Sequence, residues 1–238
     1  MILGVIQARM DSKRLPGKVL LPILGKPILW HIYNRLQFSK KLDEICISTS
    51  TNHEDDEIIK FAQTNKIKYF RGNENNLIIR HLGAANNFHA DVIVRITADN
   101  PLVDPEIIDE LISLYENNPE LDFLSNNKVH TFPIGLDIEV IPKKTLDKFI
   151  PISEDPYFYE SFIGKYIYDH PNDFKSKALR LQKPNLLRWT LDYPEDYEFI
   201  KEVYSNLYNE KKIFYMRDIL KLLDIKPEIK KINTMYYS

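Results

Sequence analysis

Short apolar runs alternate with amphipathic segments along the first half of the chain, and this alternation constrains the fold more than any other feature. The apolar runs, which we expect to be strands, span residues 3–6, 44–48, 67–70 and 91–96. Apolar residues at helical spacing predict helices over residues 27–36, 55–64, 77–88 and 105–115. Such an order predicts an α/β fold, an open and mostly parallel sheet flanked by helices. Sheets of this kind bind ligands beyond the carboxyl ends of their strands.

The second half of the chain is less regular. We expect a fifth strand near Phe123, further strands over residues 136–141, 177–181 and 187–191, and closing helices over 195–204 and 216–223. Residues 155–168 are rich in aromatic side chains. This favours an aromatic core or a dimer face over a platform that stacks bases.

A basic loop follows the first strand directly. It holds four cations and two residues that let donors approach an anion closely, namely Arg9, Lys13, Arg14, Lys18, Ser12 and Gly17. Four cations in one loop repel each other, and a bound phosphate chain is a common reason to gather them. The alternative is a solvated basic turn. The loop contains neither a Walker A motif nor a Gly-x-Gly-x-x-Gly fingerprint.

Composition excludes several classes of protein. The 238 residues suit one domain with a substantial core, and a net charge of −2 argues against a general nucleic-acid binder. The single cysteine, Cys46, cannot form an internal disulfide and lies in an apolar run, so we expect a core residue and a cytoplasmic protein. No apolar stretch has the length of a membrane span or the pattern of a signal peptide, so no membrane partner is expected.

Two carboxylates lie where a metal site is expected. Asp99 follows the strand at 91–96, and Asp192 follows the expected strand at 187–191. Carboxylates at strand ends that face a cationic loop form a site for Mg²⁺ and phosphate. Each has a plainer alternative, a turn for Asp99 and a helix cap before Pro194 for Asp192. Asp196 is expected to cap that helix.

Residues 9–18, Arg-Met-Asp-Ser-Lys-Arg-Leu-Pro-Gly-Lys, resemble the loop R-x-x-S-x-R-L-P-G-K of cytidylyltransferases that activate sugar acids. The most similar branch is the SpsF-like family of spore coat polysaccharide biosynthesis, which is related to the CMP-Kdo and CMP-sialate synthetases. Residues 95–101 resemble R-I-T-A-D-C-P with asparagine at position 100, and residues 191–196 resemble V-D-T-P-E-D. Matches in this order cover nearly the whole chain.

The resemblance implies roles for individual residues. It implies Arg9, Lys18, Asp99 and Asp192 as catalytic residues, with Asp99 and Asp192 holding Mg²⁺. The nucleotide would be bound by Ala8, Arg9, Ser12, Arg14, Lys18, Ser48, Thr49, Ser50, Arg71, Arg80 and Thr97. The acceptor would be bound by Asp137, Glu139, Glu160 and Arg188, of which Asp137 and Glu139 alternate on an expected strand and share a face. The chain departs from the family at Asn75-Asn76, where an acidic pair is usual, and at Tyr159 and Ser161.

The resemblance also implies a fold and a reaction. We expect one domain over residues 1–238 of nucleotide-diphospho-sugar transferase type (GT-A), with a small β-rich dimerisation lobe at about 128–180. The expected reaction is transfer of a nucleotide from CTP to a sugar acid or a phosphorylated small molecule, with release of pyrophosphate. The alternatives are a glycosyltransferase on the same fold, although its Asp-x-Asp motif is absent, and a nucleotide-binding relative without activity. A homodimer is expected through residues 131–168, with Tyr157, Phe158 and Phe162 at the contact.

Overall fold

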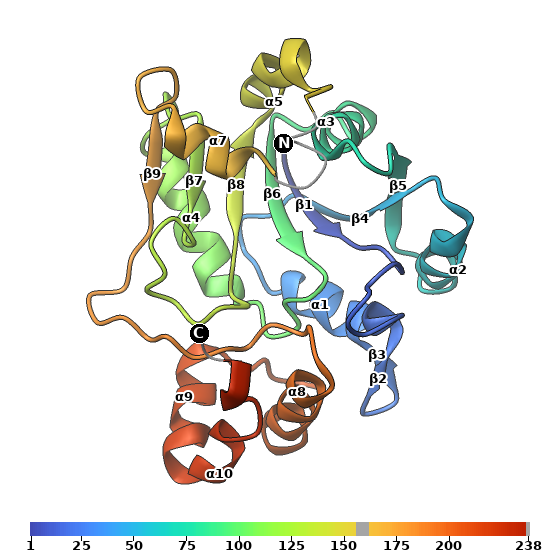
Figure 1. Cartoon of the computed structure of the whole chain (residues 1–238), viewed down its shortest axis with the longest axis vertical. Helices are drawn as coiled ribbons and strands as arrows, with labels where there is room; N and C mark the ends of the chain where they lie inside the picture. The colour runs from blue at the N-terminus through green and yellow to red at the C-terminus, as the bar shows by residue number, and fades with distance from the viewer. Residues whose placement is uncertain (156–161, 237–238) are drawn as a thin grey trace.

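The computed structural model describes residues 1–155 and 162–236, and its centre is a seven-stranded sheet. The order is β5 (Lys68–Gly72), β4 (Glu44–Ser50), β1 (Ile2–Gln7), β6 (Val92–Thr97), β8 (Glu139–Pro142), β7 (Phe123–Ser125) and β9 (Ser176–Ala178). The strands from β5 to β6 are parallel, and β8 runs antiparallel to both of its neighbours. A short hairpin, β2 (Pro22–Ile23) and β3 (Lys26–Pro27), stands apart from the sheet (Figure 1).

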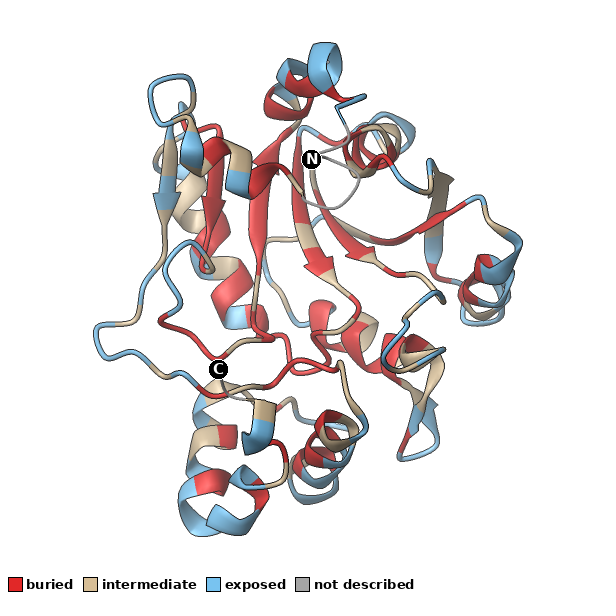
Figure 2. Cartoon of the chain, in the orientation of Figure 1, coloured by how far each residue is buried: buried red, intermediate tan, exposed pale blue. Residues whose placement is uncertain are grey.

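The central strands are buried on both faces, which explains why they have continuous apolar sequences instead of alternating ones. In β6, Val92, Ile93, Val94 and Ile96 are all buried. Figure 2 shows this burial as a red band through the middle of the molecule. The predicted strands of the first half are confirmed, as is the strand at Phe123.

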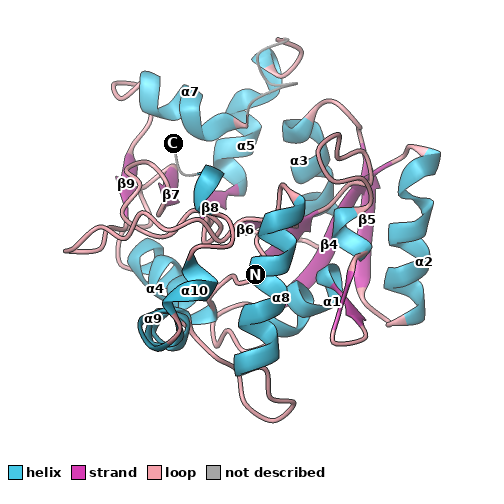
Figure 3. Ribbon diagram, turned by 60° about the horizontal axis from the view of Figure 1, so that its bottom comes forward, coloured by secondary structure: helices cyan, strands magenta, loops and turns pink. Residues whose placement is uncertain are grey.

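Helices cover both faces of the sheet (Figure 3). One face carries α3 (Leu77–Asn87), α5 (Lys143–Phe149) and α7 (Ile163–Asp169), whose apolar side chains form one buried cluster with the strands. The larger cluster contains residues from α1 (Ile28–Leu36), α2 (Asp56–Thr64), α4 (Pro105–Glu116), α8 (Pro194–Leu207), α9 (Met216–Ile225) and α10 (Pro227–Lys230). Within the described residues, no helix is long and apolar enough to cross a membrane.

The segment at residues 128–180, where a small β-rich lobe is expected, contributes both strands and helices to the central fold. The strands in the described part of this segment, β8 and β9, belong to the central sheet, and most of its regular structure is helical in α5 and α7. Leu146 and Phe149, and likewise Ile163 and Ile167, are spaced at i, i+3 or i+4, so each helix buries one apolar stripe on the sheet. Phe162 packs against the same cluster, whereas Tyr157 and Phe158 lie outside the described residues.

The expected strand at 187–191 is also absent. This segment crosses the end of the sheet and makes only an isolated bridge between Arg188 and Ile134, because no neighbouring strand extends alongside it. Similarly, the strand expected at 136–141 begins only at Glu139, so Asp137 lies before β8 instead of alternating with Glu139 along it. Both segments therefore act as loops over the carboxyl ends of β1 and β6.

Candidate active site

A cleft of about 500 Å³ opens at the carboxyl ends of β1 and β6. The basic loop forms one wall and the two predicted carboxylates lie opposite, so Arg9, Ser12, Arg14, Lys18, Asp99 and Asp192 all line it. Thr97 lines it too. The sequence therefore predicted the composition of this cleft, which is where a parallel sheet of this type binds ligands.

The basic loop is held in a fixed turn. Gly17 has φ of +67°, a left-handed conformation that other residues adopt at a cost, and its N–H donates to the Met10 carbonyl. The Leu15 N–H donates to the Ser12 hydroxyl, and the Met10 N–H donates to Asp55 on the far side of β4. This turn keeps the cations on the cleft side of β1.

Lys18 joins the loop to both carboxylates. Its Nζ lies 2.9 Å from Asp192 Oδ1 and 3.6 Å from Asp99 Oδ2, and it donates to the Leu191 carbonyl at 2.6 Å. Arg14 reaches the same Asp192 oxygen at 2.8 Å. The Lys18 side chain is 12% exposed and that of Asp192 is 14% exposed, so these pairs are weakly screened by solvent.

Backbone contacts bring Asp192 next to Asp99, although 93 positions separate them in the sequence. The Leu191 N–H donates to the Asp99 carbonyl at 2.8 Å, and the Thr190 hydroxyl donates to the same oxygen at 3.2 Å. Gly135 makes this approach possible, because a Cβ there would lie 2.4 Å from the Thr190 nitrogen. Its φ of +104° also favours glycine.

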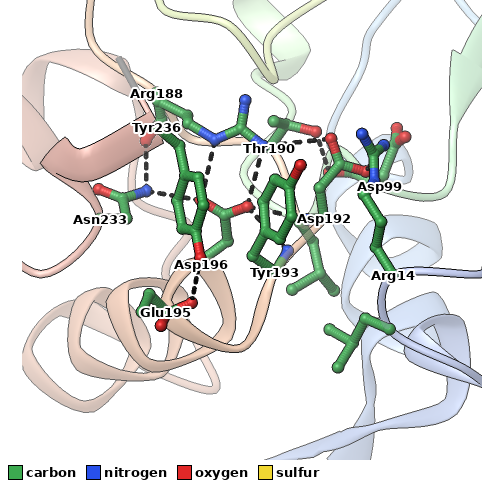
Figure 4. Close-up of polar contacts among 12 residues, drawn as sticks. Arg14, Asp99, Arg188, Thr190, Asp192, Tyr193, Glu195, Asp196, Asn233 and Tyr236 are labelled. Carbon is green, nitrogen blue, oxygen red and sulfur yellow. Dashed lines mark hydrogen bonds and ion pairs between the residues drawn. The ribbon is translucent and has the colours of Figure 1, made fainter.

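A second set of charges lies behind Asp192 (Figure 4). Arg188 donates from NH2 to Asp192 Oδ2 at 3.1 Å and forms a two-bond fork with the Asp196 carboxylate. Asp196 also accepts from the N–H groups of Asp192 and Tyr193, which confirms the predicted cap on α8. Burial alone would raise the pKa of Asp192, but the hydrogen bond and charge of Lys18, followed by Arg14 and Arg188, lower it below its usual value.

Asp99 is more accessible, with 31% of its side chain exposed. It accepts a hydrogen bond from the Thr97 hydroxyl. The described residues contain no group of three or more metal-ligating side chains. Two carboxylates are nevertheless a suitable donor set for Mg²⁺, which takes one or two carboxylates together with substrate phosphates.

Four residues expected to bind the nucleotide do not line the cleft. Ala8, Ser48, Thr49 and Ser50 are all buried, and the last three lie in β4, between β5 and β1 inside the sheet. The Ser50 hydroxyl donates to Asp55. The hydroxyl groups of Ser48 and Thr49 have no hydrogen-bond partner within the described residues.

Two further arginines expected at the nucleotide bind their own chain. Arg71 donates to the carbonyls of Ser50 and Asn52 and pairs with Asp56. Arg80 is fully buried and donates to the carbonyls of Asn73 and Glu74. Burial lowers its pKa to about 10, with a further contribution from Arg9.

One residue of the Asn75-Asn76 pair, where the chain departs from the family, has a structural explanation. Asn76 caps α3, since its side chain accepts from the Ile79 N–H and donates to the Ser153 carbonyl. The Asn76 side chain therefore both accepts from the Ile79 N–H and donates to the Ser153 carbonyl, whereas a carboxylate could only accept.

The residues expected at the acceptor lie beside the cleft instead of lining it. Glu139 forms a buried ion pair with Arg95 at 2.7 Å. Burial raises the pKa of Asp137 to about 6, although His130 opposes the shift. Arg188 is committed to Asp192 and Asp196, and Glu160 lies outside the described residues.

Sequence reasoning missed Gln7 and Arg95. Gln7 lines the cleft, and its Oε1 accepts from Arg95 Nε at 2.8 Å, so the chain Glu139–Arg95–Gln7 fixes the amide in the wall. The available signal was position: Gln7 is the last residue of β1 and immediately precedes the basic loop. Asn233 and Tyr236, which contact Arg188 and Glu195, carried no sequence signal at all.

Comparison with known proteins agrees with this geometry. A sequence model of the cytidylyltransferase family matches residues 3–229. The spore coat polysaccharide biosynthesis protein SpsF of Bacillus subtilis is 30% identical and covers 95% of each chain. The 8-amino-3,8-dideoxy-manno-octulosonate cytidylyltransferase of Shewanella frigidimarina is 32% identical over 80% of this chain and 69% of its own.

A solved structure shares the whole fold. The cytidylyltransferase from Leptospira borgpetersenii superimposes with a TM-score of 0.91 at 34% identity, covering 99% of this chain and 98% of that one. The chain belongs to the cytidylyltransferase family, and it is a nucleotidyltransferase with the GT-A-like fold expected from the sequence.

Proposed function

We propose that this cytidylyltransferase transfers CMP from CTP to a hydroxyl oxygen of a sugar acid, with release of pyrophosphate, in the synthesis of a surface polysaccharide. The observation that carries the proposal is the position of Lys18, within ion-pair distance of both Asp99 and Asp192 in a cleft walled by the basic loop. Cations and carboxylates arranged in this way suit a triphosphate with its divalent ion.

The proposed roles follow from charge. Arg9, Arg14 and Lys18 would hold the phosphates and neutralise the charge that develops on the leaving pyrophosphate. Asp99 and Asp192 would hold Mg²⁺, which supplies Lewis-acid neutralisation of the phosphate oxygens when it is bound. The residues position the acceptor oxygen and the α-phosphate, so orientation and charge account for most of the acceleration.

The acceptor is proposed from the relatives and from the cleft wall. The Shewanella relative is a cytidylyltransferase of an eight-carbon amino sugar acid. In this chain, Gln7 lines the cleft with an amide held by Arg95, and such an amide suits the hydroxyls of a sugar acid. Glu139 supports this amide through its ion pair with Arg95, and Asp137 lies beside the cleft. The glycosyltransferase alternative finds no support, because Pro101 stands where the second carboxylate of an Asp-x-Asp motif beginning at Asp99 would be.

The decisive experiment measures pyrophosphate release with each of the four nucleoside triphosphates and a panel of sugar acids, with and without Mg²⁺. We expect release only with CTP, a divalent ion and a keto-sugar acid. The control is Asp192→Asn, which should give no release under any condition. Equal turnover of all four triphosphates, or full activity in excess chelator, would contradict the proposal.

We further propose a cytoplasmic homodimer. Two neighbouring apolar side chains just after α5, Ile150 and Ile152, are exposed in the isolated chain. Exposed apolar groups gathered in one region are commonly covered by a partner. Because Phe162 packs inward, Ile150 and Ile152 replace it as the contact residues of this proposal.

A further inference from the structure

The described end of the chain reaches the catalytic carboxylate through a series of hydrogen bonds. Asn233 is fully buried, and its Nδ2 donates to Asp196 Oδ1 at 2.9 Å and to the Arg188 carbonyl at 3.1 Å. The Arg188 guanidinium forks onto Asp196 and also donates to Asp192 Oδ2. Asn233 therefore contacts both partners that orient Asp192 from behind (Figure 4).

Tyr236 adds a stacking contact from the same segment. Its ring lies parallel to that of Tyr193, with centroids 4.0 Å apart, and its hydroxyl donates to Glu195 at 2.8 Å. The Arg14 guanidinium lies 5.2 Å from the Tyr193 centroid, and Figure 4 shows Tyr193 between Tyr236 and Arg14. Tyr193, the residue next to Asp192, thus packs between Arg14 of the basic loop and Tyr236.

The energetics explain why these contacts matter for orientation. Asp196 is fully buried, so each of its oxygens needs donors. Removing the Asn233 amide leaves Asp196 Oδ1 with Arg188 Nε as its remaining side-chain donor and frees the Arg188 carbonyl. Arg188 can then move. Its guanidinium is the only cation that contacts Asp192 Oδ2 within the described residues, so Asp192 would lose this contact.

We propose that Asn233, supported by Tyr236, is a positioning residue for Asp192: it fixes Arg188 and Asp196 so that Asp192, which would hold the metal, keeps its Oδ1 directed at Lys18. These contacts lie beyond residue 229, where the family match ends. The inference rests on the proposed function, because it assigns Asp192 to the metal. Outer-shell partners of a metal ligand typically change affinity or activity about 10- to 100-fold when they are replaced.

The test compares Asn233→Ala with the wild-type protein and with Asn118→Ala. Asn118 donates its amide to the Leu114 carbonyl of α4 and does not line the cleft, so it serves as the control for the loss of an asparagine amide away from Asp192. Mn²⁺ affinity is measured by electron paramagnetic resonance of the free ion, in the presence of a non-hydrolysable CTP analogue, and kcat and KM are measured with Mg²⁺. We expect Asn233→Ala to lose about 10- to 100-fold in Mn²⁺ affinity and in kcat, with a smaller change in KM for CTP.

Asn233→Asp should lose at least as much, because a carboxylate would then face Asp196, whereas Asn118→Ala should match the wild type. Wild-type Mn²⁺ affinity in a folded Asn233→Ala protein would overturn the inference. If that variant does not fold, Tyr236→Ala makes the same test at a half-buried position, and unchanged Mn²⁺ affinity there has the same meaning. A wild-type protein that binds Mn²⁺ but releases no pyrophosphate would contradict the proposed function alone, since the Mn²⁺ comparison still decides the role of Asn233.

Discussion

At the scale of single residues, Lys18 connects the basic loop to the two carboxylates. It contacts both Asp99 and Asp192, which would otherwise repel each other across the cleft. In the proposed complex, Lys18 would gain phosphate oxygens while the two carboxylates would hold the metal.

Replacing either carboxylate should abolish turnover, because the proposed metal needs both. Asp99→Asn should leave the melting temperature nearly unchanged, since its side chain is partly exposed and faces one cation. Asp192→Asn should also lower the melting temperature, because three cations, Lys18, Arg14 and Arg188, lose their shared anion. Pyrophosphate release and thermal denaturation check both effects, and substantial activity in either variant would remove that carboxylate from the mechanism.

Lys18→Ala should weaken CTP binding by about 1.5–3 kcal/mol, the usual contribution of a hydrogen bond to a charged group. Arg14→Ala should act in the same direction. Isothermal titration with CTP measures both, and Lys60→Ala on the exposed face of α2 is the control for loss of one positive charge. Unchanged affinity in both loop variants would show that the triphosphate binds elsewhere.

Asp137 should make the fold pH-dependent. Its pKa is raised from 3.8 to about 6 by burial, so the folded state prefers the protonated carboxyl. Stability is therefore lost as the pH rises from about 4 to above 6, and Asp137→Asn should remove this loss. We expect equal stability below pH 4 and a gain of up to about 3 kcal/mol for the variant at pH 7–8, at 1.4 kcal/mol per pKa unit. Urea denaturation at several pH values measures the stability of both proteins. If Asp137→Asn gained the same stability at every pH, the raised pKa of Asp137 would not be the cause of the gain.

At the scale of elements, the site depends on loops that cross the ends of strands. The loop before β8 and the segment before α8 meet at Gly135, where Trp189 N–H donates to the Ile134 carbonyl and the backbones are in direct contact. This contact determines how closely the segment before α8 approaches the end of the sheet. Asp192 consequently depends on a glycine that is distant from it in sequence.

Gly135→Ala should therefore disturb both stability and activity. A Cβ at 2.4 Å from the Thr190 nitrogen cannot be accommodated by side-chain movement, because the contact is with backbone. Adding the strain of its φ, we expect a loss of about 1–3 kcal/mol or more, together with a large fall in kcat. Thermal denaturation and pyrophosphate release measure the two effects.

Gly25→Ala is the matched control, since Gly25 also has a positive φ, of +75°, but nothing lies within 4 Å of its Cβ position. It should cost only about 1 kcal/mol and leave kcat unchanged. Equal behaviour of the two variants would show that backbone strain, and not the approach of the two loops, determines the effect.

At the scale of the whole molecule, the mass in solution tests the proposed homodimer. Light scattering at micromolar concentration should give the mass of a dimer. Ile150→Asp combined with Ile152→Asp should give a monomer, because charged groups cannot be buried unpaired in an apolar contact. Leu186→Asp, at a 66% exposed apolar residue elsewhere on the surface, is the control and should stay dimeric. A monomer mass for the unmodified protein at every concentration would contradict the proposed dimer.

The sequence alone determined the alternation of strands and helices, the basic loop at the end of β1, and the order of the two carboxylates, because each depends on local pattern. Hydrophobic period and turn residues act over a few positions, and parallel strands place their carboxyl ends at one edge of the sheet. For this reason Arg9, Arg14, Lys18 and Asp99 were predicted in the cleft where they lie, whereas for Asp192 the family motif at 191–196 led to the right place although the strand expected before it is absent.

Only the tertiary structure decided which polar residues face the cleft and which serve the fold. Ser48, Thr49 and Arg80 match family motifs, yet the sheet and α3 bury them. Likewise, Asn233 reaches Arg188 over a separation of 45 residues. Such contacts depend on how helices and loops pack against the sheet. That packing decides which partner a buried polar group finds, and no local sequence pattern encodes it.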